Sequence, residues 1–464
     1  MRPGYASGFE TMRSLVNDRP LEVTGQLPEW LQGTLIRNGP GIFEAGPDRL
    51  RHWFDGLAVL HQFELGQGRV HYRSQPLQSP DFLEARRRGR IYYSNFATDP
   101  CVAKFRRLFS AFFPRLELGA NANVSVTRLG ERFLALTETP MAVEFDPRTL
   151  STLGVVRYQD PMADNLTTAH PHRDTNRGSL INVTLEFGPR STFRLTELLP
   201  GATRRQVLGA FPVERPSYLH SFGMAENWFI LTLGALVVDP RKLLLRRRPF
   251  IENYRFEPER GTTWALYDRR TSRFQSLQSD ALFTFHHVNA FEQGSDLVVD
   301  LITYPDATVV DSVYLDALAR AEEVPGGQLR RFRLGSTVRS ELLTDLSLEL
   351  PRIHPARLGR PYRYVYGMSQ RPGTSRDFFN MLARIDVTGG PELTWSEPGV
   401  YPGEPVFVPR PEGTAEDDGV VLCVLLEGSS SSLLVLDASN FRELARARVE
   451  LAIPFGFHGS FYTL

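Results

Sequence analysis

A short apolar run lies between two turn signals in Asp417-Asp418-Gly419-Val420-Val421-Leu422-Cys423-Val424-Leu425-Leu426-Glu427-Gly428. β-Branched and aliphatic residues favour a strand, and Asp-Asp-Gly and Glu-Gly are typical of the turns that bound one. Runs of the same kind recur from near residue 33 to the end of the chain, and the clearest are residues 33–37, 133–137, 228–233, 296–301 and 362–366. This recurrence predicts an all-β protein.

The length of the chain indicates how these strands are arranged. Long helical periodicity is scarce, which disfavours Rossmann and TIM-barrel folds. An all-β chain of 464 residues must protect its sheet edges, and a β-propeller does so by repeating four-stranded blades around an axis. At about 40–65 residues a blade, the chain would fill about seven blades. No WD40 or kelch repeat is present, so the strands alone leave a pair of β-sandwich domains open as the alternative. Ser429 to Ser432 are expected to form a short polar turn.

Composition excludes several classes of protein. Lys plus Arg number 53 and Asp plus Glu number 53, so the net charge is zero, which argues against a nucleic-acid-binding protein with a basic surface. Two cysteines, Cys101 and Cys423, cannot form a disulfide framework. The N-terminal residues lack the apolar core of a secretory signal, and no run of about 20 apolar residues occurs. We therefore expect a cytoplasmic protein without a transmembrane segment.

One segment, residues 104–116, has the periodicity of an amphipathic helix. Its polar face carries Arg106, Arg107 and Ser110. Such a helix either packs its apolar stripe on the core or lies in the interface of an anionic membrane, and phenylalanines flanked by Arg and Lys suit the second arrangement. The residues expected at the membrane are Phe105, Leu108, Phe109, Phe112, Phe113 and Leu116.

Histidine is the sparse residue type that points to chemistry. Four of the ten histidines, His170, His220, His286 and His458, stand in apolar or turn-rich surroundings, and His172 and His287 flank two of them. A buried imidazole needs a hydrogen-bond partner or a metal. The four lie too far apart in the chain for one helix or hairpin to unite them, but a radial fold could send one from each of four blades to the axis. Competing motifs such as GxGxxG, HExxH, CxxC and GxSxG are absent.

Further motifs give the chain a resemblance to a known family. They are Arg37-Asn-Gly-Pro-Gly41, His52-Trp-Phe-Asp-Gly56, the four histidine segments, Glu349-Leu-Pro-Arg-Ile353, Gly359-Arg-Pro-Tyr-Arg-Tyr364, Gly403-Glu-Pro-Val-Phe-Val408, Glu416-Asp-Asp-Gly-Val-Val421 and Gly456-Phe-His-Gly459. In this order they resemble the carotenoid cleavage oxygenase family along nearly the whole chain. The His52 motif and Thr98-Asp-Pro-Cys101 resemble its animal-type branch, which includes the β-carotene oxygenases and the retinoid isomerohydrolase.

The resemblance implies a fold and a metal site. It implies one domain over residues 1–464: a seven-bladed β-propeller with a dome of loops and short helices over its top face. It implies iron(II) on the propeller axis, and the family pattern Phe-His-x-x-Asn favours His286, three residues before Asn289, over His287. The implied ligands are His170, His220, His286 and His458. Carboxylates that orient them map to Glu138, Glu349 and Glu404, and Thr137 resembles a residue that crowds one open coordination position.

The resemblance also implies a reaction. Four nitrogens around an octahedral ion leave two positions open, enough for dioxygen as co-substrate, and the expected activity is cleavage of one C=C bond of a carotenoid or apocarotenoid into two carbonyl products. The motifs also allow two other activities, trans-to-cis isomerisation of a retinoid with ester cleavage and cleavage of a stilbenoid. A propeller used only as an interaction scaffold is the non-enzymatic alternative. Because carotenoids dissolve in membranes, the resemblance favours membrane contact by residues 104–116, and it makes Cys101 a candidate for acylation.

Overall fold

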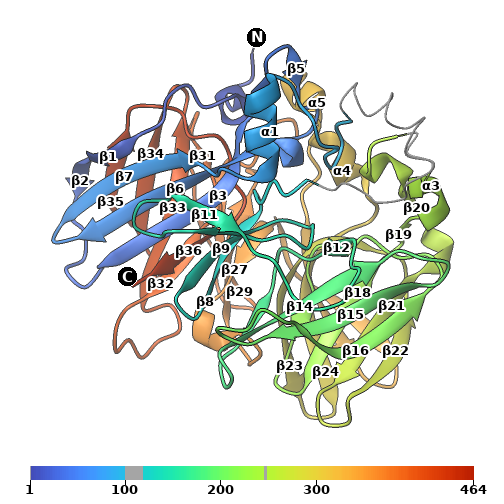
Figure 1. The fold of residues 1–464 in the computed structure, drawn as a ribbon. Coiled ribbons are helices and arrows are strands. Elements are labelled where there is room, and N and C mark those ends of the chain that lie inside the picture. The colour runs from blue at the N-terminus through green and yellow to red at the C-terminus, as the bar shows by residue number, and fades with distance from the viewer. Residues whose placement is uncertain (1, 100–118, 245–247, 464) are drawn as a thin grey trace.

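The computed structural model describes residues 2–99, 119–244 and 248–463. Seven sheets of four to six strands surround a common centre as the blades of a β-propeller (Figure 1). The helix expected at residues 104–116, with its apolar residues from Phe105 to Leu116, lies outside the described residues, as does Cys101. The predicted all-β propeller of seven blades is confirmed, and the alternative of two sandwiches is wrong.

The blades follow one another along the chain. Blades 1 to 3 contain β1 (Asn17–Pro20), β3 (Gly33–Ile42), β6 (Leu57–Gly66), β7 (Arg69–Pro76) and β36 (Gly459–Tyr462); β8 (Ser125–Leu129), β9 (Arg132–Leu136), β10 (Val143–Phe145) and β11 (Thr152–Val155); and β12 (Leu166–Thr167), β13 (His172–Asp174), β14 (Ser179–Glu186), β15 (Ser191–Leu198) and β16 (Gln206–Val213). Blades 4 and 5 contain β17 (Gly223–Met224), β18 (Trp228–Leu233), β21 (Thr262–Asp268) and β22 (Arg273–Ser279); and β23 (Phe283–Gln293), β24 (Asp296–Tyr304), β25 (Gln328–Leu334) and β26 (Val338–Ser347). Blades 6 and 7 contain β27 (Glu349–Arg352), β28 (Tyr364–Ser369), β29 (Met381–Asp386) and β30 (Leu393–Trp395); and β2 (Glu22–Gly25), β31 (Tyr401–Pro402), β32 (Val406–Pro409), β33 (Gly419–Glu427), β34 (Ser430–Asp437) and β35 (Glu443–Val449).

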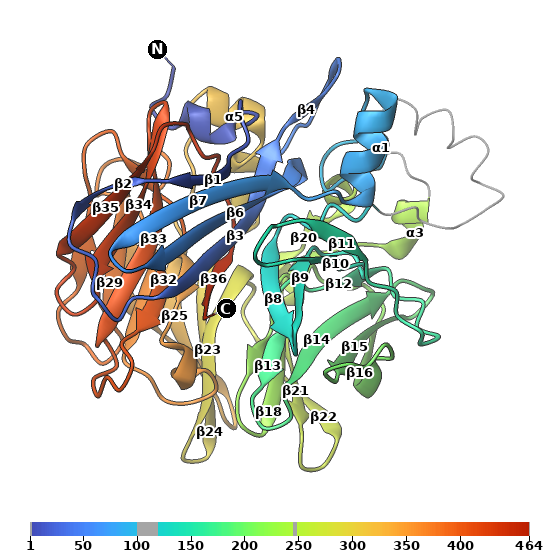
Figure 2. The same cartoon turned by 60° about the vertical axis from the view of Figure 1, so that its left-hand side comes forward.

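Strands from the two ends of the chain close the ring. The last strand, β36, pairs antiparallel with β3 in blade 1, with Leu35 opposite Phe461. The early strand β2 pairs antiparallel with β35 in blade 7, with Val23 opposite Ala447. Blades 1 and 7 therefore each contain strands from both ends of the chain, and these strands hold the first and last blades of the ring together (Figure 2).

The apolar run of residues 420–426 lies in β33, and its continuous hydrophobicity has a structural cause. Val420 and Leu422 belong to the core between blades 7 and 1, whereas Val421 and Cys423 belong to the core between blades 7 and 6. A strand buried on both faces needs apolar residues at every position. Each fully buried Val or Leu side chain contributes about 1.5–3 kcal/mol to this packing.

The other sequence runs also lie in strands, with small differences at their ends. Thr137 and Tyr362 fall just outside β9 and β28. The polar turn expected at Ser429 to Ser432 is wrong for its last three residues, which begin β34. A buried serine is tolerated at position 431 because its Oγ accepts from the amide of Ile453, in the loop before β36, at 2.8 Å.

Most of the short helices and ribbons lie in connections between strands of the same blade, and α1 lies between blades 1 and 2. These elements are α1 (Pro80–Arg88), α3 (Pro240–Leu244), α4 (Thr308–Ser312) and α5 (Leu315–Ala319), the 3-10 turns at Ala6–Phe9, Trp53–Asp55, Ile251–Asn253, Pro258–Arg260 and Pro355–Arg357, and the ribbons β4 (Glu44–Ala45) with β5 (Asp48–Arg49) and β19 (Leu236–Val237) with β20 (Arg255–Phe256). Helix α1 begins where Ser79 caps the amide of Phe82 and ends at Gly89 in the left-handed conformation (φ 62°). None of the described helices has the length and apolar character needed to cross a membrane.

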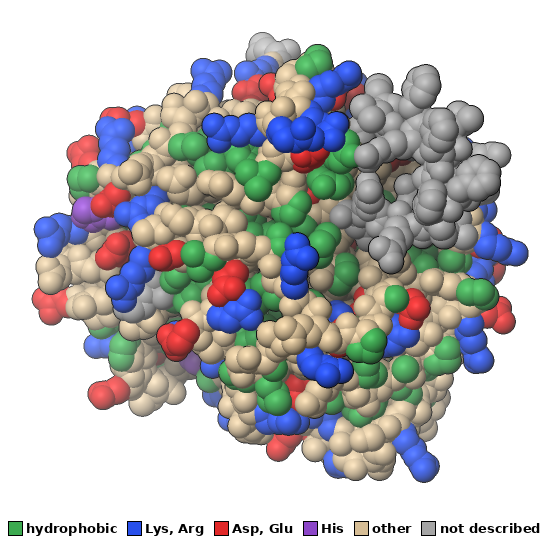
Figure 3. Space-filling model, viewed as in Figure 1, with side chains coloured by type: hydrophobic (Ala, Val, Ile, Leu, Met, Phe, Trp, Pro, Cys, Tyr) green, Lys and Arg blue, Asp and Glu red, His purple; other side chains and the backbone are tan. Residues whose placement is uncertain are grey.

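The dome is formed in part by these helices. Asp81 of α1, Leu243 of α3 and Val309 of α4 all line one large cavity, which also reaches the propeller axis. On the face drawn in Figure 3, basic and acidic side chains are interspersed over the described surface, as the equal numbers of the two charges predict.

Candidate metal centre

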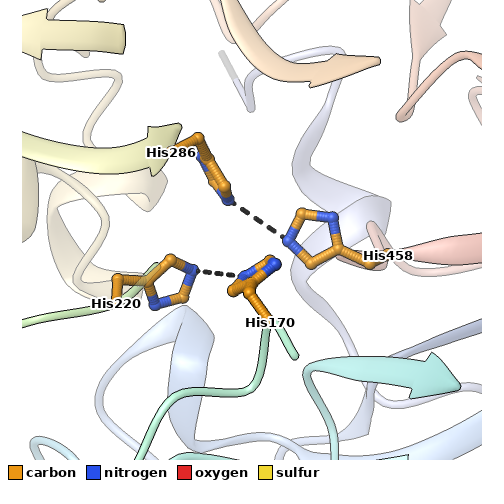
Figure 4. Close-up of side chains that lie close together, drawn as sticks. All are labelled: His170, His220, His286 and His458. Carbon is orange, nitrogen blue, oxygen red and sulfur yellow. Dashed lines mark hydrogen bonds between the residues drawn. The ribbon is translucent and has the colours of Figure 1, made fainter. Parts of the chain in front are cut away.

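Four histidines meet at the propeller axis. Their potential ligand nitrogens all lie within 4.8 Å of one another (Figure 4). The Nε2 atoms of His170 and His220 are 3.0 Å apart, and those of His286 and His458 are 3.2 Å apart. The structure therefore brings together the four histidines that the sequence singled out.

Each histidine reaches the axis from the inner edge of a different blade. His170 precedes β13 of blade 3, His220 precedes β17 of blade 4, His286 lies in β23 of blade 5, and His458 immediately precedes β36 of blade 1. This placement explains how residues so far apart in the chain become neighbours.

Three carboxylates come from the remaining blades. Glu138 follows β9 of blade 2, Glu349 begins β27 of blade 6, and Glu404 lies between β31 and β32 of blade 7. Each accepts a short hydrogen bond from one imidazole: Nδ1 of His220 to Glu138 at 2.6 Å, Nδ1 of His286 to Glu349 at 2.7 Å, and Nδ1 of His458 to Glu404 at 2.7 Å. Every blade thus contributes one residue to the set of seven.

These hydrogen bonds decide which way the imidazole lone pairs point. An ionised carboxylate only accepts, so Nδ1 carries the proton and the lone pair stays on Nε2. The Nε2 atoms face one another at the axis, where their lone pairs repel unless a proton or a cation lies between them. Neutral imidazole nitrogens are ligands that suit iron, zinc, copper and nickel. The donor set fits such an ion.

The two flanking histidines are held elsewhere. His287 lies between two irregularities in the pairing of β23 with β24, and its ring nitrogens lie 2.8 Å from the hydroxyls of Ser221 and Thr232. His172 donates from Nε2 to the carbonyl of Phe222 at 2.7 Å. The structure therefore places His286, not His287, at the axis, because a bulge re-aims one of two adjacent side chains.

Sequence reasoning missed the residues that support the carboxylates. Tyr218 donates to Glu138 at 2.8 Å and Tyr304 donates to Glu349 at 2.8 Å. Arg352 donates from Nε to Glu404 at 2.8 Å. Tyr218 stands two residues before His220, and Arg352 lies within the motif that begins at Glu349. Both residues therefore belong to segments that the sequence singles out, but nothing in the sequence indicates that they bind the carboxylates.

Burial and neighbouring charges set the protonation states. Burial lowers the pKa of His458 to about 4, although Glu404 opposes that shift, and burial lowers the pKa of His170 well below its ordinary value, with the other three imidazoles adding to the effect. Burial alone would raise the pKa of Glu404, but Arg352 and His458 lower it to about 2. At neutral pH these histidines are neutral and this carboxylate is ionised.

The charges of the buried carboxylates also favour a divalent cation. Glu404 has Arg352 as a direct partner, and Arg37 lies 3.8 Å from it. Among the described residues, the other two carboxylates accept hydrogen bonds only from groups without a permanent charge: tyrosine hydroxyls, imidazoles and, for Glu349, the amide of Leu350 at 2.7 Å. A buried charge without compensation is unfavourable, so two carboxylates leave two negative charges that a divalent ion at the axis would balance.

A largely apolar cavity lies directly against this cluster. His220, His286 and His458 form part of its wall, and Thr137 and Val124 line it as well. The carbonyl of Val124 accepts a hydrogen bond from the amide of His458 at 3.2 Å. The aromatic part of the lining includes Phe54, Phe96, Phe250, Phe285, Phe379 and Phe457. Such a cavity suits a long apolar molecule that reaches the axis.

Comparison with known proteins shows which family has this sequence and architecture. A sequence model of the family described as retinal pigment epithelial membrane protein, RPE65, matches residues 9–463. Human β,β-carotene 15,15'-dioxygenase is 33% identical over 509 aligned residues, which cover 95% of this chain and 92% of the human protein. The carotenoid isomerooxygenase of Galleria mellonella is 34% identical over 492 aligned residues, which cover 95% of this chain and 93% of the insect protein.

Solved structures agree with the sequence relatives. The crystal structure of cobalt-substituted Synechocystis ACO matches with a TM-score of 0.88 and 29% identity, covering 99% of this chain and 98% of that chain. A mutant of the Synechocystis apocarotenoid oxygenase matches with a TM-score of 0.87, 29% identity and the same coverage. The family model and both relatives span nearly the whole chain, and the chain therefore belongs to the RPE65 family of carotenoid cleavage oxygenases.

Proposed function

We propose that this protein is a non-haem iron(II) dioxygenase that cleaves one C=C bond of a carotenoid or apocarotenoid into two aldehyde or ketone products. The observation that carries the proposal is the cluster of four inward-facing imidazoles at the wall of an apolar cavity. The printed names of the relatives, a carotene dioxygenase and a carotenoid isomerooxygenase, support the substrate class.

In this proposal His170, His220, His286 and His458 would hold the iron, and Glu138, Glu349 and Glu404 would fix the orientation of three of them. Bound iron(II) would supply the activation of dioxygen. The reaction balances without another oxidant, since both oxygen atoms of O2 end in the two carbonyl groups. An alkene has no labile proton, so the side chains need not act as a general acid or base. Their part is to position one double bond and exclude water.

The alternative activities use the same centre, so the site geometry does not separate them. Isomerohydrolysis of a retinoid ester would add water rather than dioxygen to the substrate. The names of the relatives reported above favour oxygenation, and we therefore propose cleavage. Thr137 lines the cavity next to Glu138, and its expected position near an open coordination site stays a prediction.

We predict one tightly bound iron per chain. His220→Ala should abolish stoichiometric binding, because it removes a ligand and leaves Glu138 without its partner. Glu349→Gln should lower metal affinity by about 10- to 100-fold, because a neutral amide no longer holds the proton on Nδ1 of His286. Elemental analysis and competition with a coloured chelator measure both effects, and His71→Ala, at an exposed histidine paired with Asp18, is the matched control. Wild-type protein without iron, together with unchanged stability of His220→Ala, would support the scaffold alternative instead.

Isotope labelling tests the reaction itself. The iron-loaded protein is incubated under ¹⁸O2 with a panel of carotenoids, apocarotenoids and stilbenes, and the products are identified by mass. We expect one labelled oxygen in each of two carbonyl fragments from a polyene, after correction for exchange with water. Unlabelled products, or an isomerised alcohol of unchanged carbon number, would contradict dioxygenation.

We also propose that residues 1–464 form one domain that works in the cytoplasm at a membrane surface, with residues 104–116 as the contact. The sequence pattern of that segment and the solubility of carotenoids in lipid support it. Phe109→Glu combined with Phe112→Glu should reduce sedimentation with anionic vesicles at least severalfold and leave the cleavage of detergent-dispersed substrate unchanged. Equal sedimentation of the variant and the wild type would contradict the proposal.

A further inference from the structure

A pair of polar side chains lies inside the apolar core between blades 1 and 7. Arg37 of β3 stands directly opposite His61 of β6, so the two side chains project from the same face of blade 1. Leu35 and Phe63, two residues away on the same face, belong to the core that blade 1 shares with blade 7. Arg37 and His61 are each only 4% exposed. A charged group in such a core destabilises the fold unless it is paired, so Arg37 calls for an explanation.

The protein pairs Arg37 only in part. Nη1 donates to the carbonyl of Glu404 at 2.9 Å and Nη2 to the carbonyl of Phe457 at 3.3 Å. The Glu404 carboxylate lies 3.8 Å from Nη1, beyond hydrogen-bond distance, and it already accepts from Arg352. Two guanidinium groups thus share one carboxylate, and one positive charge remains. The Arg352 side chain is 31% exposed and that of Arg37 only 5%, so the buried charge without compensation is that of Arg37.

A small cavity lies beside the guanidinium group. Arg37 and His61 line it together with Gly403, Gly456 and apolar residues of β33 and of the segment before His458. A Cβ atom at Gly403 would lie 3.5 Å from Nη2 of Arg37, and one at Gly456 would lie 3.6 Å from the same atom. Neither glycine has a positive φ, so the backbone conformation does not require glycine at these positions. Their missing side chains leave room beside Nη2 for about one water-sized particle.

His61 offers a second donor to this cavity. Burial raises the pKa of Tyr72 above its ordinary value, and a hydrogen bond donated by Ser74 opposes that shift. The hydroxyl of Tyr72 is then free to donate to Nδ1 of His61, 2.8 Å away, which leaves the ring proton on Nε2. Nε2 has no hydrogen-bond partner among the described residues, yet it is not one of the atoms sealed off from a water-sized molecule, so it opens onto the cavity. Burial lowers the pKa of His61 to about 3, with Arg37 adding to the effect, so the imidazole is a neutral donor.

We propose that this cavity binds a small monovalent anion, chloride in the cell, between Nη2 of Arg37 and Nε2 of His61. None of the described residues that line the cavity carries a carboxylate. A chloride ion accepts from both donors and balances the buried positive charge, whereas a water molecule would leave that charge unbalanced. The cavity has room for a halide but not for a polyatomic anion. Because Arg37 also holds the carbonyl of Phe457, next to His458, the anion would stabilise the closure of the ring beside the axis. The proposal is independent of the proposed function.

Bromide tests the site directly, because it replaces chloride and scatters X-rays anomalously. In crystals grown with bromide, we expect an anomalous peak beside Nη2 of Arg37 and Nε2 of His61. In solution, chloride in place of gluconate at constant ionic strength should raise the unfolding temperature by about 2 °C or more, because a ligand that binds only the folded state stabilises it. A water molecule at the site in bromide crystals, without an anomalous peak, would overturn the proposal.

Three variants separate the site from general effects of salt. Gly403→Ala places a methyl group in the cavity without removing a donor, so it should lose the stabilisation by chloride. His61→Phe keeps a ring but removes the Nε2 donor, and the chloride concentration that gives half of the effect should rise by about 10-fold or more. His71→Phe, the same change at the exposed histidine of β7 that pairs with Asp18, is the matched control and should respond as the wild type does.

The outcomes are distinguishable from failure of the proposed function, because no readout uses iron or a polyene. An equal response to chloride in the wild type and in Gly403→Ala would mean that chloride acts elsewhere on the protein, and it would overturn the proposal. Loss of the response in Gly403→Ala together with the bromide peak in the wild type would support it, whether or not the protein cleaves a polyene.

Discussion

The centre of the molecule depends on hydrogen bonds between buried carboxylates and imidazole Nδ1 atoms, the shortest of which joins His220 to Glu138 at 2.6 Å. Each bond fixes a tautomer, so that the lone pair of Nε2 points at the axis, and among the described residues Glu138 and Glu349 have no arginine to balance their negative charge. A divalent cation at the axis would accept the lone pairs and balance the negative charges at the same time. The constraint explains why the fold delivers carboxylates and imidazoles together, from every blade of the ring.

Closure of the ring and construction of the centre use the same segment of chain. His458 immediately precedes β36, which completes blade 1 by pairing with β3. Glu404 accepts from Nδ1 of His458 and from the amide of Gly459 at 2.8 Å, so the last strand is anchored at the axis as well as in the sheet. Deletion of residues 458–462 would therefore remove both the strand that pairs with β3 and one of the four imidazoles at the axis.

The all-β class and the four histidines could be predicted from the sequence, because apolar runs between turn signals and the chemistry of imidazole are local properties. It could not unite His170 with His458 without a family resemblance, since only the ring brings them together. Tyr218 and Arg352 escaped notice because their roles depend on contacts between blades. Ser431 was misplaced in a turn, since its partner Ile453 is distant in the chain.

X-ray absorption at the iron edge of the iron-loaded protein tests the central claim most directly, because it reports the atoms bound to the metal. We predict a shell of nitrogen and oxygen atoms, without sulfur, and the outer-shell scattering pattern of four imidazole rings. A shell fitted by fewer than four imidazoles, or one that contains sulfur, would contradict it.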